Sequence, residues 1–438
     1  MSFHTRIFLY ILISVFLTAC NGEKPDTGSD KIVYIENKDD VYTLYRNGKP
    51  FFVKGAAGFT NLKRLKEVGG NTIRTWDTVN LKQILDSAKL YDLAVVVGLP
   101  MPPSESLQDF YNNNERTGAF ISKMTALVSK FKHHPALLSW CVGNELAFPY
   151  KPKYSKFYRT FNDIVDMIHR KDPDHPVTTT VMSFQTKNIT NIKLRTNIDF
   201  ISFNIFGSIK SLEKDLKEFK WFWDGPFLIT EWSIEGPWVL ENQNAWGAYI
   251  ESTSTKQAEQ YLEIYQKYMP VKNSRFLGSM VFYWGHKQEL TPTWFSLFDE
   301  NGRHTETVNV MQFIWTGKKA TKQAPQVDYM LLNGKGARDN IFVKPNQMAT
   351  GTLYMRANTE YKNLKFKWEL LIEDWHKPDG IFSEKKPRKI AGLAESENLE
   401  IQFKAPAKEG PYRLYVYVYD NDGLFATSNT PFYVLSKP

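Results

Sequence analysis

From about residue 41 the hydrophobic and polar positions of the chain follow two alternating patterns. Short apolar runs rich in β-branched residues are separated by longer amphipathic runs, as strands and helices that follow one another would be. Eight short runs predict strands, at residues 50–56, 71–76, 93–99, 136–143, 176–182, 199–205, 226–232 and 277–284. Most are apolar on consecutive positions, which is typical of parallel strands that are covered on both faces.

The runs between these strands predict helices. In residues 61–70, Leu62, Leu65 and Val68 fall on one helix face, and two glycines then end the helix. The same spacing predicts helices within residues 117–135, 153–173, 208–219 and 254–269. Eight strand–helix units over about 280 residues predict a (β/α)8 barrel, a fold that typically has about 250 residues. The competing fold is a doubly wound sheet, but no glycine-rich phosphate loop follows the first strand.

Beyond residue 326 the pattern changes to strand signals at short intervals. Residues 326–438 therefore predict a C-terminal β-sandwich of immunoglobulin-like type, which would serve as an accessory domain. In its last long strand, Tyr412, Leu414, Val416 and Val418 alternate with polar or aromatic neighbours. We expect one face of that strand to lie in the core and the other to face solvent.

The beginning of the chain has the features of a targeting segment. Arg6 precedes the apolar run IFLYILISVFL and the tetrapeptide LTAC. This tetrapeptide resembles the lipobox of bacterial lipoproteins, which implies a signal peptide at residues 1–20, lipid on Cys20 and a lipid-anchored protein of the bacterial cell envelope, at the outer membrane or cell surface. An ordinary signal peptide or a membrane anchor is the alternative. Residues 21–40 would be a tether, and residues 41–318 the catalytic barrel.

Charge and composition add few candidate partners. The net charge of +8 comes from 55 basic and 47 acidic residues spread along the chain, without the dense basic block of a nucleic-acid-binding protein. No spacing of histidine, cysteine and carboxylate residues suggests a metal site, and we expect no cofactor. The second cysteine, Cys141, lies in a strand and is expected to be an unpaired core residue.

Candidate chemistry lies at the C-terminal ends of the predicted strands, where barrels of this kind place their active sites. Strands four and seven end in Glu145 and Glu231. Two glutamates in one pocket are what hydrolysis of a glycosidic bond requires, since one protonates the leaving oxygen and the other attacks or stabilises the anomeric carbon. Glu235 is a local rival of Glu231, but we expect it to be a loop or substrate-contact residue.

Other strand ends carry residues that suit sugar binding. Arg74 would keep one carboxylate ionised, and we expect burial to raise the pKa of the glutamate farther from it, which becomes the acid. Asn144 would hydrogen-bond a sugar hydroxyl. Trp284 would stack against a pyranose ring, and Asn204 and Trp232 are further candidates for substrate contacts.

Several segments resemble one enzyme family. HPALLSWCVGNE (134–145) is similar to the strand-four signature of retaining glycoside hydrolases of clan A, especially the family 2 barrels and the related family 5 enzymes. FLITEWS resembles their strand-seven motif, GGNTIRTWD their strand-two segment, and FVKGAAG and MVFYWG their strands one and eight. The resemblance covers residues 41–315. It implies that Glu145 is the acid/base, Glu231 the nucleophile, and Arg74, Asn144 and Trp284 subsite residues.

The predicted function is therefore retaining hydrolysis of O-glycosyl bonds in a β-linked oligo- or polysaccharide. Two alternatives remain open. One is a glycan-binding surface lipoprotein with a non-catalytic barrel, and the other is a clan A transglycosylase.

Overall fold

The computed structural model describes residues 31–105, 108–239, 243–357, 363–373, 387–393 and 398–436. Eight parallel strands close into a barrel in chain order, and the last pairs with the first. They are β4 (Val53–Ala57), β5 (Thr72–Arg74), β6 (Ala94–Leu99), β7 (Leu137–Asn144), β8 (Val177–Met182), β9 (Phe200–Ile205), β10 (Phe227–Trp232) and β11 (Phe276–Phe282). The predicted (β/α)8 barrel is confirmed.

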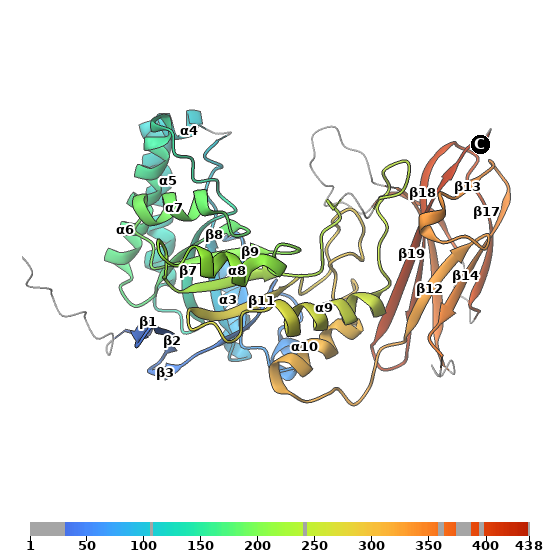
Figure 1. Ribbon diagram of the computed structural model, residues 1–438, viewed down its shortest axis with the longest axis horizontal. Coiled ribbons are helices and arrows are strands. Elements are labelled where there is room, and N and C mark those ends of the chain that lie inside the picture. Colours follow the sequence, from blue (N-terminus) through green and yellow to red (C-terminus); the bar gives the residue numbers. More distant parts are fainter. Residues whose placement is uncertain are drawn as a thin grey trace, which may run out of the picture.

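At least one helix follows each barrel strand and packs on the outside of the barrel (Figure 1). The helix α6, for example, buries Phe157, Phe161 and Ile164 on one face, as its amphipathic sequence predicts. The helices are α2 (Leu62–Glu67), α3 (Leu81–Leu90), α4 (Gln108–Asn112), α5 (Asn114–Phe131), α6 (Ser155–Lys171), α7 (Thr186–Arg195), α8 (Ile209–Glu218), α9 (Ser254–Tyr268) and α10 (Glu306–Thr316). None of the helices in the described ranges is long and apolar enough to cross a membrane.

A small antiparallel sheet closes the N-terminal end of the barrel. It consists of β1 (Val33–Lys38), β2 (Val41–Arg46) and β3 (Lys49–Pro50). Val33 and Leu44 pack against residues at the beginnings of the barrel strands, including Leu138, Phe200 and Leu228.

Residues 33–38 therefore form a strand where the sequence predicted a tether, because Val33 fills the open end of the barrel instead of facing solvent. The predicted signal peptide and residues 21–30 of the predicted tether lie outside the described part of the chain.

The C-terminal region consists of two packed sheets, so the predicted β-sandwich is confirmed; its immunoglobulin-like type stays a prediction. One sheet has the order β12 (Val327–Leu332), β14 (Met348–Met355), β17 (Glu400–Lys404). The other has the order β13 (Phe342–Val343), β19 (Phe425–Val434), β18 (Gly410–Tyr419), β15 (Lys365–Ile372), β16 (Lys389–Gly392). Trp368, Leu414 and Val416 are fully buried between the sheets.

The face of β18 that was expected to meet solvent is buried instead. Tyr415, Tyr417 and Tyr419 are at most 8% exposed and stack along the strand. Arg303, from a loop of the barrel, lies 3.7 Å from the centre of the Tyr419 ring. The expectation is wrong because these aromatic residues cover the side of the sandwich that docks against the barrel, to the right of α9 and α10 in Figure 1.

A group of buried polar residues fixes this contact; we call Arg413, Glu373, Asn429 and Glu251 the interdomain cluster. Arg413 donates from Nε and Nη2 to the two oxygens of Glu373, at 2.6 and 2.8 Å, and from Nη1 to Asn429 at 2.6 Å. Its Nη2 also donates to the carbonyl oxygen of Tyr249, at 2.6 Å. Asn429 in turn donates to Glu251, at 2.8 Å. Sandwich residues thus bind directly to the loop that leads into α9.

Candidate active site

A cleft of about 1380 Å³ opens at the C-terminal end of the barrel strands. This volume exceeds the roughly 300–1,000 Å³ of ordinary small-molecule pockets, so several sugar rings would fit. Both predicted catalytic residues, Glu145 and Glu231, line it, together with Asn144. Aromatic residues line much of the remaining wall, namely Phe59, Trp76, Phe206, Trp238, Phe282 and Tyr283.

The backbone is irregular where each glutamate enters the cleft. The register between β7 and β8 shifts between Cys141 and Asn144, and the register between β10 and β9 shifts between Ile229 and Glu231. Glu145 follows the end of β7 with a φ of 53°, in the left-handed region that costs a residue with a side chain about 1 kcal/mol or more. Such irregularities change the direction of side chains at the ends of strands. Here each of the two register shifts lies just before a glutamate of the cleft.

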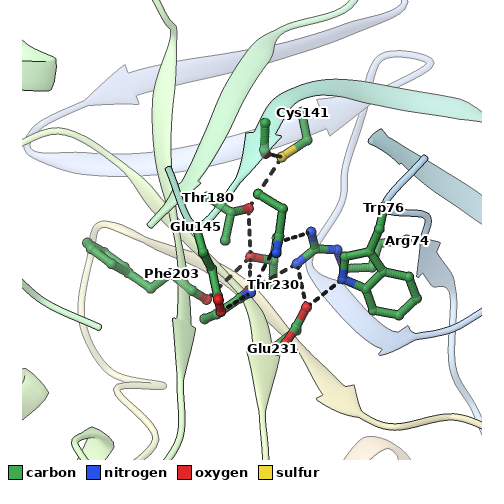
Figure 2. Close-up of polar contacts among 11 residues, drawn as sticks. Arg74, Trp76, Cys141, Glu145, Thr180, Phe203, Thr230 and Glu231 are labelled. Atoms are coloured by element: carbon green, nitrogen blue, oxygen red, sulfur yellow. Dashed lines mark hydrogen bonds and ion pairs between the residues drawn. The ribbon is translucent and has the colours of Figure 1, made fainter. Parts of the chain in front are cut away.

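Glu231 is 5% exposed and accepts two hydrogen bonds on one oxygen. Arg74, which is fully buried on β5, donates from Nη1 to Glu231 Oε1 at 3.1 Å. The indole Nε1 of Trp76 donates to the same oxygen at 2.7 Å. Figure 2 shows Trp76, Arg74 and Glu231 joined in this way. Because both donors use Oε1, Oε2 is the oxygen on which an attack on substrate would depend.

Asn204 and Arg74 together connect Glu231 with Glu145. Its Oδ1 accepts from Arg74 Nη1 at 2.9 Å, and its Nδ2 donates to Glu145 Oε1 at 2.9 Å. Arg74 also donates from Nη2 to Asn144 Oδ1, at 3.0 Å. These residues form the cleft cluster, which consists of Arg74, Trp76, Asn144, Glu145, Asn204 and Glu231. One arginine is thus shared by a carboxylate and two amides, and the glutamates of strands four and seven are linked through Arg74 and Asn204 together.

A second layer of side chains orients Asn204. Thr230 donates to its Oδ1 at 3.0 Å, and Thr180 lies 3.2 Å from the Thr230 hydroxyl. Cys141 lies 3.3 Å from the hydroxyl of Thr180, so the expected unpaired core cysteine lies behind this layer (Figure 2). With Oδ1 occupied by two donors, the amide nitrogen of Asn204 must face Glu145.

The surroundings of Glu231 shift its pKa. Burial raises its pKa to about 7, although Arg74 lowers it and the charge of Glu145 raises it further. The expectation that the glutamate farther from Arg74 would carry the raised pKa is therefore wrong. Loss of water around Glu231 outweighs the attraction of Arg74, whose donors also serve Asn144 and Asn204.

Two predicted substrate-binding residues do not reach the cleft. Trp232 is fully buried and packs against Tyr261 and Tyr265 of α9. Successive residues of a strand point to opposite faces, so the inward position of Glu231 sends Trp232 outward. Trp284 is also fully buried, and it packs against Phe298 and Trp315. Both predictions of sugar contacts are wrong.

Arg74 and Asn204 were also predicted to bind substrate, but they lie beneath the floor of the cleft. They are 0% and 1% exposed, and their polar contacts run to the carboxylates and amides described above. Their place in the structure is that of positioning residues. Asn144, in contrast, does line the cleft.

Sequence reasoning missed Trp76 and Tyr283. Their rings stack with 5.9 Å between centroids and 26° between planes, and both line the cleft. Trp76 follows Arg74 by two positions, and strand periodicity puts residues i and i+2 on one side. That signal would have found Trp76. Tyr283 is adjacent to Phe282, which also lines the cleft, so the alternation of strand residues would have placed Tyr283 on the other side.

Comparisons with known proteins agree with this architecture. Residues 61–277 match the family described as glycosyl hydrolases family 2, TIM barrel domain. The β-glucuronidase of Rattus norvegicus is 28% identical over a region that covers 30% of this chain and 22% of the rat protein.

Two solved structures share the fold. A β-D-glucuronidase of Dictyoglomus thermophilum aligns with a TM-score of 0.51 and 17% identity, covering 67% of this chain and 55% of that one. A family 2 β-galacturonidase of Eisenbergiella tayi, bound to galacturonate, aligns with a TM-score of 0.51 and 16% identity, covering 66% and 55%. This chain thus spans less than two thirds of the length of each of these relatives. Its barrel is similar to the TIM-barrel domain of glycosyl hydrolases family 2.

Proposed function

We propose that this chain hydrolyses O-glycosyl bonds of a β-linked oligo- or polysaccharide with retention of configuration. One observation carries the proposal: carboxylates from strands four and seven line one cleft and are linked through Arg74 and Asn204. Similar proteins named β-glucuronidase and β-galacturonidase support the β configuration.

In the first step Glu231 attacks the anomeric carbon through Oε2, and Glu145 gives its proton to the departing glycosidic oxygen. An ester between the sugar and Glu231 results. In the second step Glu145 takes a proton from water, which attacks the same carbon and releases Glu231 as a carboxylate. Arg74 and Trp76 donate to Oε1 throughout, so they stabilise the charge that returns to Glu231.

Replacement of Glu231 tests the proposal. We expect Glu231→Gln to lower release of reducing ends from the true substrate by about 10⁴-fold or more, because no nucleophile remains. Glu235→Gln is the matched comparison, since Glu235 lines the same cleft four residues later and pairs with Lys210 at 2.5 Å. Its loss should be at least about a hundred times smaller. Equal activity of wild type and Glu231→Gln would overturn the assignment.

Product analysis separates the alternatives. Proton NMR of the first product should show the β anomer, since two displacements restore the configuration. An α anomer would indicate an inverting enzyme. Longer oligosaccharides at high substrate concentration would indicate a transglycosylase, and binding without any product would indicate a glycan-binding protein.

The proposed location is the bacterial cell envelope, with lipid on Cys20. The apolar run before LTAC supports it. Labelling with a radioactive fatty acid in a bacterial host should mark the wild type and leave Cys20→Ser unmarked. A labelled Cys20→Ser protein would contradict the anchor.

A further inference from the structure

The cleft is rich in carboxylates. Six acidic residues line it, namely Asp77, Glu145, Glu231, Glu235, Glu289 and Glu300. Among the described lining residues, Lys287 is the only lysine or arginine, and His286 adds one further titratable group. A ligand that enters the cleft therefore meets mostly negative charge.

The cations that touch these carboxylates are already engaged in ion pairs. Arg74 lies 3.1 Å from Glu231, Lys287 lies 2.7 Å from Glu289, and Lys210 lies 2.5 Å from Glu235. A uronate carboxylate would have to displace one of these partners and would stand among the remaining acidic groups. Repulsion between like charges can exclude a ligand, just as favourable contacts can select one.

Gln288 offers a different kind of contact in the same cleft. It lines the cleft and is 6% exposed, and neither its Nε2 nor its Oε1 has a hydrogen-bond partner among the described residues. A buried amide without hydrogen-bond partners is unfavourable. A ligand that supplies both a donor and an acceptor would make the missing hydrogen bonds. A pair of sugar hydroxyls does so, since each hydroxyl both donates and accepts.

We propose that the cleft binds a neutral β-glycan, not a uronide, and that Gln288 reads its hydroxyl groups. This inference rests on the proposed glycosidase function and names the substrate class of the same site. Trp76 and Tyr283 provide uncharged stacking faces, and Phe59 and Trp238, 40% and 46% exposed, extend the apolar wall. Neutral pyranose rings present C–H faces to such surfaces.

Calorimetry on pairs of tetrasaccharides that differ only at C6 tests the choice. We use β-1,4-glucose against β-1,4-glucuronate and β-1,4-mannose against β-1,4-mannuronate, with Glu231→Gln protein to prevent turnover. This variant removes one negative charge and so favours the anionic ligands, against the proposal. We expect the neutral member of a pair to bind about tenfold tighter or more. Equal or tighter binding of a uronate, or no binding of any neutral glycan, would overturn the inference.

A positively charged ligand distinguishes attraction to the acidic cleft from recognition of sugar hydroxyl groups. A chitosan tetramer carries amines in place of hydroxyls at C2 and is otherwise like the β-1,4-glucose tetramer. Weaker binding of chitosan supports recognition by the Gln288 amide. Tighter binding than that of every neutral tetramer would show that the acidic charge selects the ligand, and would overturn the proposal.

The role of Gln288 is tested by Gln288→Leu in the same background. We expect neutral glycan affinity to fall about tenfold or more, since two hydrogen bonds are lost. The thermal unfolding midpoint should stay unchanged or rise, because leucine removes an amide that has no hydrogen-bond partner among the described residues; a merely structural glutamine would lower the midpoint. Gln312→Leu on α10 is the control and should leave glycan affinity unchanged. Unchanged affinity of Gln288→Leu would contradict the assignment.

Turnover distinguishes this inference from the proposed function. If the Glu231→Gln protein binds neutral glycans and wild type cleaves none, hydrolysis is wrong and the inference stands. If wild type cleaves aryl β-glucuronides faster than aryl β-glucosides, hydrolysis stands and the inference is wrong.

Discussion

The cleft cluster and the interdomain cluster use the same residue types and hold their charges differently. Arg413 contacts both oxygens of Glu373, at 2.6 and 2.8 Å, and all three of its nitrogens have partners. Arg74 contacts only one oxygen of Glu231, at 3.1 Å, and its buried Nε has no partner among the described residues. A bidentate pair is saturated, whereas a shared arginine leaves one carboxylate oxygen available.

The pKa values reflect this difference. Burial is the largest influence on the pKa of Arg413 and lowers it, but the charge and hydrogen bond of Glu373, together with the charges of Tyr415 and Glu251, raise it above the usual value, so Arg413 keeps its charge. Glu231 has a pKa of about 7 because burial outweighs its partners. The pair of Arg413 and Glu373, in which both carboxylate oxygens are hydrogen-bonded, stabilises the contact between domains. The pair of Arg74 and Glu231 leaves one carboxylate oxygen available for reaction, at some cost in stability.

The largest expected effect comes from breaking the saturated pair. Glu373→Gln leaves Arg413 buried without the carboxylate that it contacts directly, and we expect it to lower the free energy of unfolding by about 3–5 kcal/mol. Urea denaturation measures this, and kcat/KM per folded molecule should be retained. Glu400→Gln, on the exposed surface of β17, is the control and should unfold like wild type. A loss below about 1 kcal/mol would show that the two clusters do not differ as argued.

Replacing Glu231 in the cleft should raise the free energy of unfolding, whereas replacing Glu373 should lower it. The folded pKa of Glu231, about 7, lies above its ordinary value of 4.5, so wild-type stability is fully present below pH 4.5 and falls as pH rises to 7. Glu231→Gln lacks this fall, and we expect it to be about 3 kcal/mol more stable than wild type at pH 8 and similar at pH 4. Urea denaturation at both pH values checks this; lower stability of the variant at pH 8 would contradict it.

Trp76→Phe keeps the ring and removes the donor to Glu231. A hydrogen bond to a charged group contributes about 1.5–3 kcal/mol, so kcat/KM should fall roughly 10- to 100-fold. The pKa of Glu231 should rise, because Trp76 lowers it in wild type. Steady-state kinetics over a pH series measures both effects. Trp221→Phe, at a position that is 81% exposed, is the matched control, and an equal loss in that variant would exclude a specific role for Trp76.

The smallest effect is the pH dependence of the wild type. Attack requires ionised Glu231, so kcat/KM should fall about tenfold for each pH unit below 7. The midpoint should be the same in Glu373→Gln, since the interdomain cluster does not touch Glu231. An acidic limb near pH 4.5 would mean that burial does not govern this carboxylate.

The sequence predicts the barrel well because its strands are covered on both faces and therefore read as continuous apolar runs. The ends of strands four and seven likewise pointed to Glu145 and Glu231 without any knowledge of tertiary contacts. Strand β1 was missed because its residues Val33–Lys38 bury only one hydrophobic position deeply, and a single valine does not distinguish a short strand from a tether.

Side-chain direction and tertiary docking account for the other errors. Trp232 follows Glu231, whose side chain points into the cleft, and so Trp232 points outward. The prediction considered only that Trp232 lies at a strand end and not the direction of its side chain. Trp284 lies beyond the end of β11, where no periodicity fixes its direction. The buried tyrosine face of β18 depends on another domain, and no pattern within one strand indicates what covers it.

The sheet that closes the N-terminal end of the barrel also has a geometric consequence. Strand β1 enters beneath the beginnings of the barrel strands, and the cleft opens at their opposite ends. A lipid on Cys20 would precede β1 by only a dozen residues. An anchored molecule would therefore stand with its closed end toward the membrane and its cleft turned away, toward polymers too large to approach the lipid surface.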